Sequence, residues 1–163
     1  MALGYSSAMD ERRDLLRHAV ATVAYRANRA VSGAPEDFAL FAGAGRQPLE
    51  ILAHMGDLFD WALSMAEGRQ RWQDSRPLPW NEERQRFFTA LEAFDELLRS
   101  ERPMVASIER LLQGPVSDAL THIGQLAMLR RLQGSPVQGE NFYVAEIEAG
   151  RAGAKQAAPV KTF

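Results

Sequence analysis

Apolar residues recur every three to four positions along most of the chain, which is the spacing of helices that bury one face. No run of alternating β-branched residues indicates a β-strand. The pattern predicts an all-α four-helix bundle, with long helices over about residues 10–32, 48–67, 81–100 and 115–133 and a short extra helix over 103–112. The last long helix is apolar around most of its circumference, so we expect it to be the most central.

Glycine, proline and asparagine mark the expected ends of these helices. Gly68 and Gly134 follow the second and the last helix, where a glycine readily ends a helix in the left-handed conformation. Asn81 is a favourable N-cap for the third helix. The pair Gly114-Pro115 is expected to break the chain just before the last helix, because proline removes a helical hydrogen bond.

Two segments outside the helices are too rich in anchoring side chains to be simple linkers. Residues 69–80 hold prolines and tryptophans, which predict a long but ordered irregular loop after the second helix. Residues 135–163 follow the bundle of about 10–134 as an extension that we expect to wrap the bundle or a neighbouring subunit. The whole chain, 1–163, is expected to form one domain.

Composition narrows the range of functions. The chain has 163 residues, 46% of them apolar, a net charge of −2 and 25% charged residues. This balance gives no broad attraction to nucleic acid or to an anionic membrane, and no apolar run approaches the ~18 residues of a membrane span. Without a signal-like apolar segment near Met1, we expect a cytoplasmic protein. The absence of cysteine leaves only nitrogen and oxygen ligands for any metal.

The most informative stretch places Asp118 and His122 four residues apart in the last helix. This spacing puts both side chains on one helical face, with Cβ atoms roughly 6 Å apart. His54 lies at the edge of the apolar stripe of the second helix. If the two helices pack together, His54, Asp118 and His122 converge as a two-histidine, one-carboxylate site for a divalent transition metal with open coordination positions.

Each of these residues also has a purely structural interpretation. Asp118 is an acid in the first turn of its helix, where the helix dipole favours it, and it also has the spacing for an ion pair with His122. His54 also suits a hydrogen-bonded core histidine. His18 points away from the apolar stripe of the first helix, so we expect it at the surface or under the tail.

Two further acids flank His54 and are second choices for the site. Glu50 and Asp57 precede and follow His54 by four and three residues. Either is an additional ligand candidate or an acceptor for the free ring nitrogen of His54. Glu50 is also explained as an acid in the first helical turn, and Asp57 points further from the apolar stripe.

Two stretches of the chain resemble those of a known family. The first is Leu52-Ala-His54, followed by Trp61, and the second is His122-Ile-Gly124-Gln125, followed by Leu129-Arg-Arg-Leu132. With the order of the helices, they resemble the DinB-like (YfiT-like) four-helix-bundle family, from the first helix to about Val137. The resemblance implies that one histidine of the second helix and a histidine pair of the last helix hold a metal such as nickel or zinc. Here Asp118 replaces the middle histidine, which should shift the preference toward iron, manganese or zinc.

The resemblance also implies a class of reaction on a small molecule. It points to metal-dependent transfer or isomerisation with a low-molecular-weight thiol, or to metal-dependent hydrolysis with Asp57 or Glu50 as candidate bases. The rival is a non-catalytic homodimeric binding or stress-associated module with a vestigial or empty site, which dimerises through the apolar faces of its helices. The extension, with Trp72 and Trp80, is a candidate cap for the pocket mouth, although core packing also explains these aromatic residues.

Overall fold

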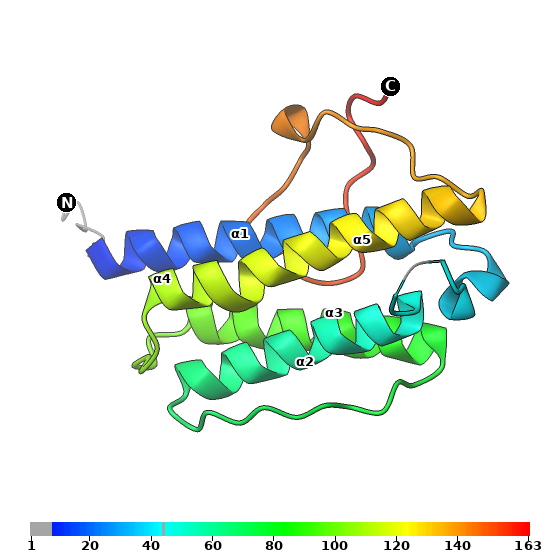
Figure 1. The fold of residues 1–163 in the computed structure, drawn as a ribbon. Coiled ribbons are helices and arrows are strands. Elements are labelled where there is room, and N and C mark those ends of the chain that lie inside the picture. Colours follow the sequence, from blue (N-terminus) through cyan, green and yellow to red (C-terminus); the bar gives the residue numbers. More distant parts are fainter. Residues whose placement is uncertain (1–7, 44) are drawn as a thin grey trace.

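The structure is a computed structural model that describes residues 8–43 and 45–163 (Figure 1). Its helical elements are α1 (Ala8–Val31), η1 (Glu36–Leu40), α2 (Pro48–Ala66), α3 (Trp80–Arg99), α4 (Ile108–Leu111), η2 (Leu112–Val116), α5 (Ser117–Gln133) and η3 (Phe142–Val144). Within the described ranges there is no β-strand, so the expected all-α class is confirmed. None of the helices in these ranges combines the length and hydropathy needed to cross a bilayer.

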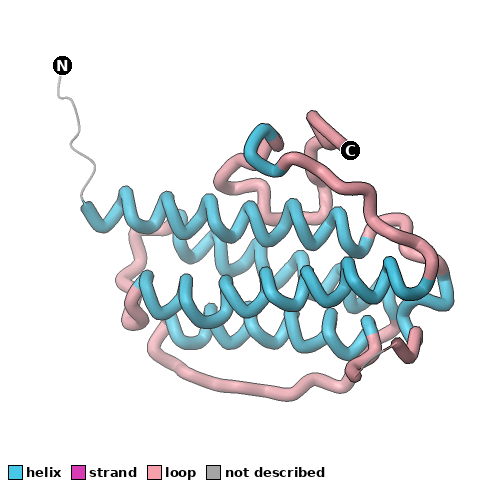
Figure 2. The backbone as a smooth tube through the Cα atoms, turned by 45° about the horizontal axis from the view of Figure 1, so that its top comes forward, coloured by secondary structure: helices cyan, strands magenta, loops and turns pink. Residues whose placement is uncertain are grey.

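The long helices form a bundle in which each one has two neighbours. α1 and α2 each pack against both α3 and α5. α1 and α5 run in one direction, and α2 and α3 run in the other (Figure 1). Because α2 and α3 are parallel, the connection 67–79 must return along the full length of α2, and it does so at the edge of the bundle (Figure 2).

Burial differs from the expectation that the last long helix is the most central. α2 buries twelve of its 19 residues, whereas α5 buries only five of its 17. Met128 and Leu132 of α5 are 54% and 57% exposed. The prediction was wrong because the outer face of α5 carries apolar residues that no other element of the described bundle covers.

Two predicted helix starts are also corrected. α3 begins at Trp80 with Pro79 as its N-cap, so Asn81 lies inside the first turn. The short helix begins at Ile108 rather than Pro103, because the side chain of Ser107 caps it. By contrast, the expected stops after α2 and α5 are confirmed, and Gly68 and Gly134 adopt positive φ angles of 74° and 91°.

Gly114-Pro115 does not break the chain. The helix continues through η2, a π-helical turn that contains Pro115, and runs from Ile108 to Gln133 without leaving helical geometry. The wider turn tolerates the missing N–H of Pro115, and the Ser117 hydroxyl donates a 2.7 Å hydrogen bond to the carbonyl of Leu112. Consequently the residues that begin α5 do not stand at a free helix end.

A buried charged cluster attaches the long connection 67–79 to α2 and α3. The Asp57 carboxylate accepts hydrogen bonds from the Ser75 backbone N–H at 2.9 Å and from Arg86 Nη1 at 3.0 Å. Arg86 Nε donates to Glu83 at 2.5 Å, and Nη2 donates to the carbonyl of Ala53. Through these bonds one guanidinium ties two parallel helices and their connection together.

The C-terminal extension lies on α1. The buried Glu140 carboxylate accepts a 2.6 Å hydrogen bond from the Tyr25 hydroxyl and lies 3.0 Å from Nε of Arg29. The ring of Phe142 contacts Tyr25 and the guanidinium of Arg26. The extension therefore packs on the bundle itself, on a different side from the connection 67–79 (Figure 1).

Candidate metal centre

α2 and α5 are antiparallel neighbours, and this packing brings His54 of α2 beside Asp118 and His122 of α5. Asp118 Oδ2 lies 3.8 Å from His54 Nε2, and Asp118 Oδ1 lies 3.5 Å from His122 Nε2. One ligand atom from each of the three residues falls within 4.8 Å of the others. The three residues singled out from the sequence thus converge at one point.

The separations suit a shared metal ion. Nitrogen and oxygen ligands at about 2.0–2.1 Å from a tetrahedral metal lie roughly 3.3 Å apart. The two distances, which run to the two oxygens of Asp118, exceed this value by a few tenths of an ångström. The widest separation among the three ligand atoms is up to 4.8 Å, so a bound metal would also draw the side chains closer together. The rings of His54 and His122 stand at 87° to each other with centroids 4.8 Å apart, so they do not stack. The residues present fit a divalent metal with nitrogen and oxygen ligands.

Gln125 sets the orientation of His122. Nδ1 of His122 lies 2.9 Å from Oε1 of Gln125. An amide oxygen accepts but does not donate, so Nδ1 carries the ring proton. Nε2 then keeps its free lone pair on the side of Asp118, which is the tautomer that a metal ligand needs.

The surroundings of His54 favour its neutral form. The pKa of His54 is lowered below 6.5, first by burial, then by the nearby His122 and by the positive charge of Arg46. Asp118 and Asp57 act in the opposite direction and are outweighed. At neutral pH the imidazole is therefore uncharged, which is the state that binds a metal.

Asp118 is the most exposed of the three, with 46% of its side chain accessible. The helix-dipole explanation for this residue requires a free helix end. Asp118 instead follows the continuous helical turns α4 and η2, which begin at Ile108. The groups beside the Asp118 carboxylate are therefore the rings of His54 and His122, at 3.8 and 3.5 Å, rather than the N–H groups of a free helix end.

The two second-choice acids lie outside the cluster. The Glu50 carboxylate accepts a 2.8 Å hydrogen bond from the backbone N–H of Gln47 and caps α2. Asp57 is buried against Arg86 and the connection 67–79. His18 is exposed on α1, as the helical pattern indicated. None of Glu50, Asp57 and His18 is part of the three-residue group.

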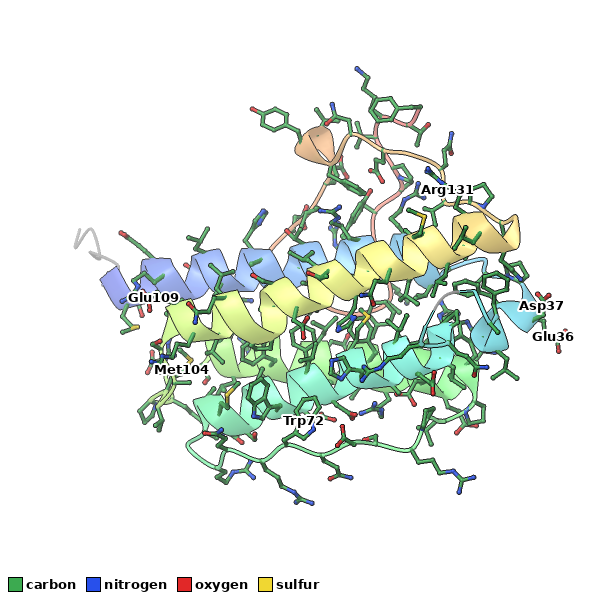
Figure 3. All side chains as sticks on the ribbon, viewed as in Figure 1. Glu36, Asp37, Trp72, Met104, Glu109 and Arg131 are labelled. Carbon is green, nitrogen blue, oxygen red and sulfur yellow. The ribbon has the colours of Figure 1, made fainter. Side chains whose placement is uncertain are left out.

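Of the two tryptophans considered for the pocket mouth, only Trp72 lies at the site. Its ring meets those of His54 and Trp61 at centroid distances of 5.5 and 5.6 Å. Trp72 projects from the connection 67–79 toward α2 (Figure 3). Trp80 packs instead against Phe38, at 5.6 Å, and the extension lies on α1, so neither covers the cluster as expected.

A cleft of about 480 Å³ lies beside His122. It is lined by Gly45, Arg46, Ile51, His122, Gln125, Met128, Leu129 and Leu132. The sequence did not single out Arg46, because it lies in an irregular glycine-rich connection where no periodicity assigns a direction to a side chain. Gln125 was noted only as part of the resemblance, although its spacing of three residues from His122 was a usable signal.

No family model, curated protein or solved structure matches this chain. The resemblance to the DinB-like family therefore rests on the order of the helices and on the residues around His54 and His122. A functional proposal for this chain therefore depends on the geometry and chemistry of those residues.

Proposed function

We propose that the protein binds a divalent transition metal, such as zinc, nickel, iron or manganese, through His54, Asp118 and His122. The observation that carries this proposal is the approach of three ligand atoms, from two helices, to within 4.8 Å of one another. The neutral state of His54 and the hydrogen bond that orients His122 support it independently. The DinB-like resemblance agrees with the same three positions.

The site belongs, in this proposal, to a metal-dependent enzyme that acts on a small molecule. A bound divalent metal would lower the pKa of a thiol or a water in an open coordination position. The chain has no cysteine, so a thiol must arrive as a cosubstrate. Trp72 covers one side of His54, and a cleft through which a ligand could approach borders the cluster at His122.

Thiol transfer is favoured over hydrolysis among these reactions. Glu50 caps α2 and Asp57 pairs with Arg86, so neither acid is free to act as a general base at the cluster. A thiol, with an ordinary pKa of about 8.5, needs less assistance to ionise than water does. A low-molecular-weight thiol is therefore the expected cosubstrate, and several classes of electrophile are compatible with it.

Cobalt(II) binding tests the metal site without knowledge of the substrate. Wild-type protein should take up one equivalent with the visible absorption of a low-coordinate cobalt ion, and His54→Ala and His122→Ala should each lose most of it. His18→Ala is the matched control and should bind like the wild type, because His18 lies on α1 outside the cluster. Equal cobalt binding in all four proteins would refute the assignment.

A second candidate, a non-catalytic homodimeric module, is favoured by an apolar groove of about 420 Å³ between α1 and the 108–120 segment. Leu15 is 68% exposed at this groove, and Leu112 is 40% exposed. A second copy of the chain would cover both side chains. This candidate predicts a dimer by light scattering that Leu15→Glu converts to a monomer, together with no stoichiometric metal. A monomeric wild type at high concentration would exclude it.

A further inference from the structure

The cleft beside the three-residue cluster combines apolar walls with the guanidinium of Arg46. Its apolar lining comes from Ile51, Met128, Leu129 and Leu132, while His122 stands at the boundary with the cluster. Met128 and Leu132 are each more than half exposed. Apolar side chains that line an open cleft indicate a ligand with an apolar body, and about 480 Å³ lies within the usual range for small-molecule sites.

Arg46 is the only lysine or arginine among the described residues that line this cleft. In the part of the chain that the structure describes, no carboxylate lies within ion-pair distance of its guanidinium. Arg46 is exposed, so a ligand bound in the cleft can reach its guanidinium. Arg46 thus places a positive charge in the same cleft as His122.

We propose that this cleft binds a small monocarboxylate with an apolar body, whose carboxylate pairs with Arg46 and whose opposite end reaches the cluster at His122. A planar guanidinium matches the two oxygens of a carboxylate. One guanidinium balances one negative charge, which favours a monocarboxylate over a phosphate dianion. The reaction at the opposite end rests on the proposed metal site, whereas the recognition of the carboxylate does not.

A matched pair of ligands tests this inference, namely mercaptohexanoic acid and mercaptohexanol. Both have a thiol and the same number of carbons, and they differ in whether the other end carries a charge. Isothermal titration into metal-free and zinc-loaded protein should show the acid binding roughly three- to tenfold more tightly than the alcohol. Arg46→Gln should remove this preference, and Arg46→Lys should keep part of it.

Arg131→Gln is the control for the loss of a positive charge. Arg131 follows His122 by nine residues, so it lies half a turn away on α5, and Figure 3 places it on the side that faces away from α2. This variant should keep the full preference for the acid. Because Arg46 and Arg131 are both exposed, thermal melting should find the three arginine variants as stable as the wild type.

The outcomes separate the cleft from the metal site. Equal affinity for the acid and the alcohol would overturn the inference. A preference that survives Arg46→Gln would overturn it as well, because another group would then hold the carboxylate. A preference that depends on Arg46 in a protein that binds no zinc would support the cleft and refute the metal site. Zinc binding without a preference for the acid over the alcohol would support the metal site and refute the cleft.

Discussion

At the scale of single residues, the hydrogen bond between His122 Nδ1 and Gln125 Oε1 orients His122 for the proposed metal site. Gln125→Leu removes the acceptor, so His122 loses its preferred tautomer and ring orientation. We expect zinc affinity to fall about tenfold, in the lower part of the range for such contacts. Gln125→Glu keeps an acceptor and should bind zinc at least as well as the wild type. A competition titration with a coloured chelator measures both, and equal weakening in the two variants would contradict this role.

A substitution at Asp118 is expected to strengthen metal binding rather than weaken it. Asp118→His replaces a partly exposed carboxylate with a third imidazole, the ligand type that the DinB-like resemblance implies at this position. Because imidazole suits nickel and zinc better than a carboxylate does, the affinity for both should rise. Titration of each metal into the wild type and the variant compares them. Unaltered affinity would remove Asp118 from the set of ligands.

The candidate metal ligands could be predicted from the sequence because they lie in helices, where the spacing along the chain fixes the direction of each side chain. A spacing of four residues aligns Asp118 with His122 in any helix, and the apolar stripe of α2 orients His54 toward its neighbour. Arg46 follows no such rule, because it lies in an irregular connection. The engagement of Asp57 with Arg86 also depends on which helices are parallel, which the pattern of one helix does not reveal.

At the scale of elements, the Arg86 cluster stabilises the pairing of α2 with α3. Arg86→Met leaves the buried carboxylates of Asp57 and Glu83 without their cation. Removal of one partner from a buried ionic cluster is strongly destabilising, so we expect the free energy of unfolding to fall by about 3 kcal/mol. Urea denaturation measures this change. Arg99→Gln, which breaks an exposed ion pair with Glu96 on the same helix, should leave the midpoint unchanged.

The elements show where local signals along the chain predict a helix end and where they do not. The helix stops at Gly68 and Gly134 are local, because glycine adopts the positive φ that ends a helix. Pro115 is also a local signal, yet the chain absorbs it in the π-helical turn η2 rather than breaking. The outcome at Pro115 depends on neighbours in the bundle, since Pro115 and Val116 are both buried.

At the scale of the whole molecule, a hydrogen bond from the Tyr25 hydroxyl to the Glu140 carboxylate attaches the extension 135–163 to the bundle. Burial and the hydrogen bond to Glu140 raise the pKa of Tyr25 from 10.0 to about 12. The folded state therefore keeps a proton that the unfolded chain releases above pH 10. This contribution to stability is complete below pH 10 and is lost as the pH rises toward 12.

The Tyr25→Phe variant isolates this contribution. Phenylalanine has no hydroxyl to titrate, so the variant should lose less stability than the wild type between pH 10 and pH 12. Urea unfolding at a series of pH values compares the two proteins. If the free energy of unfolding falls equally in both proteins over this range, the protonated Tyr25 hydroxyl does not stabilise the folded state.

The bundle itself follows from the apolar pattern, whereas the path of the extension does not. Four amphipathic helices of similar length have few ways to bury their stripes, so the class of fold is readily predicted. The extension has no periodic pattern, and its position depends on single contacts such as those of Glu140 with Tyr25 and Arg29. The extension consequently lies on α1 and does not cover the cluster. Trp72 contacts the cluster at His54, and the cleft borders it at His122.

The most direct test of the proposed metal centre is the metal content of tag-free protein purified without chelator, measured by elemental mass spectrometry beside the His54→Ala variant. We expect about one equivalent of a transition metal in the wild type and almost none in the variant. A wild-type protein that is empty as purified, and that also fails to take up zinc, nickel, manganese or iron(II), would contradict the assignment of His54, Asp118 and His122 as metal ligands.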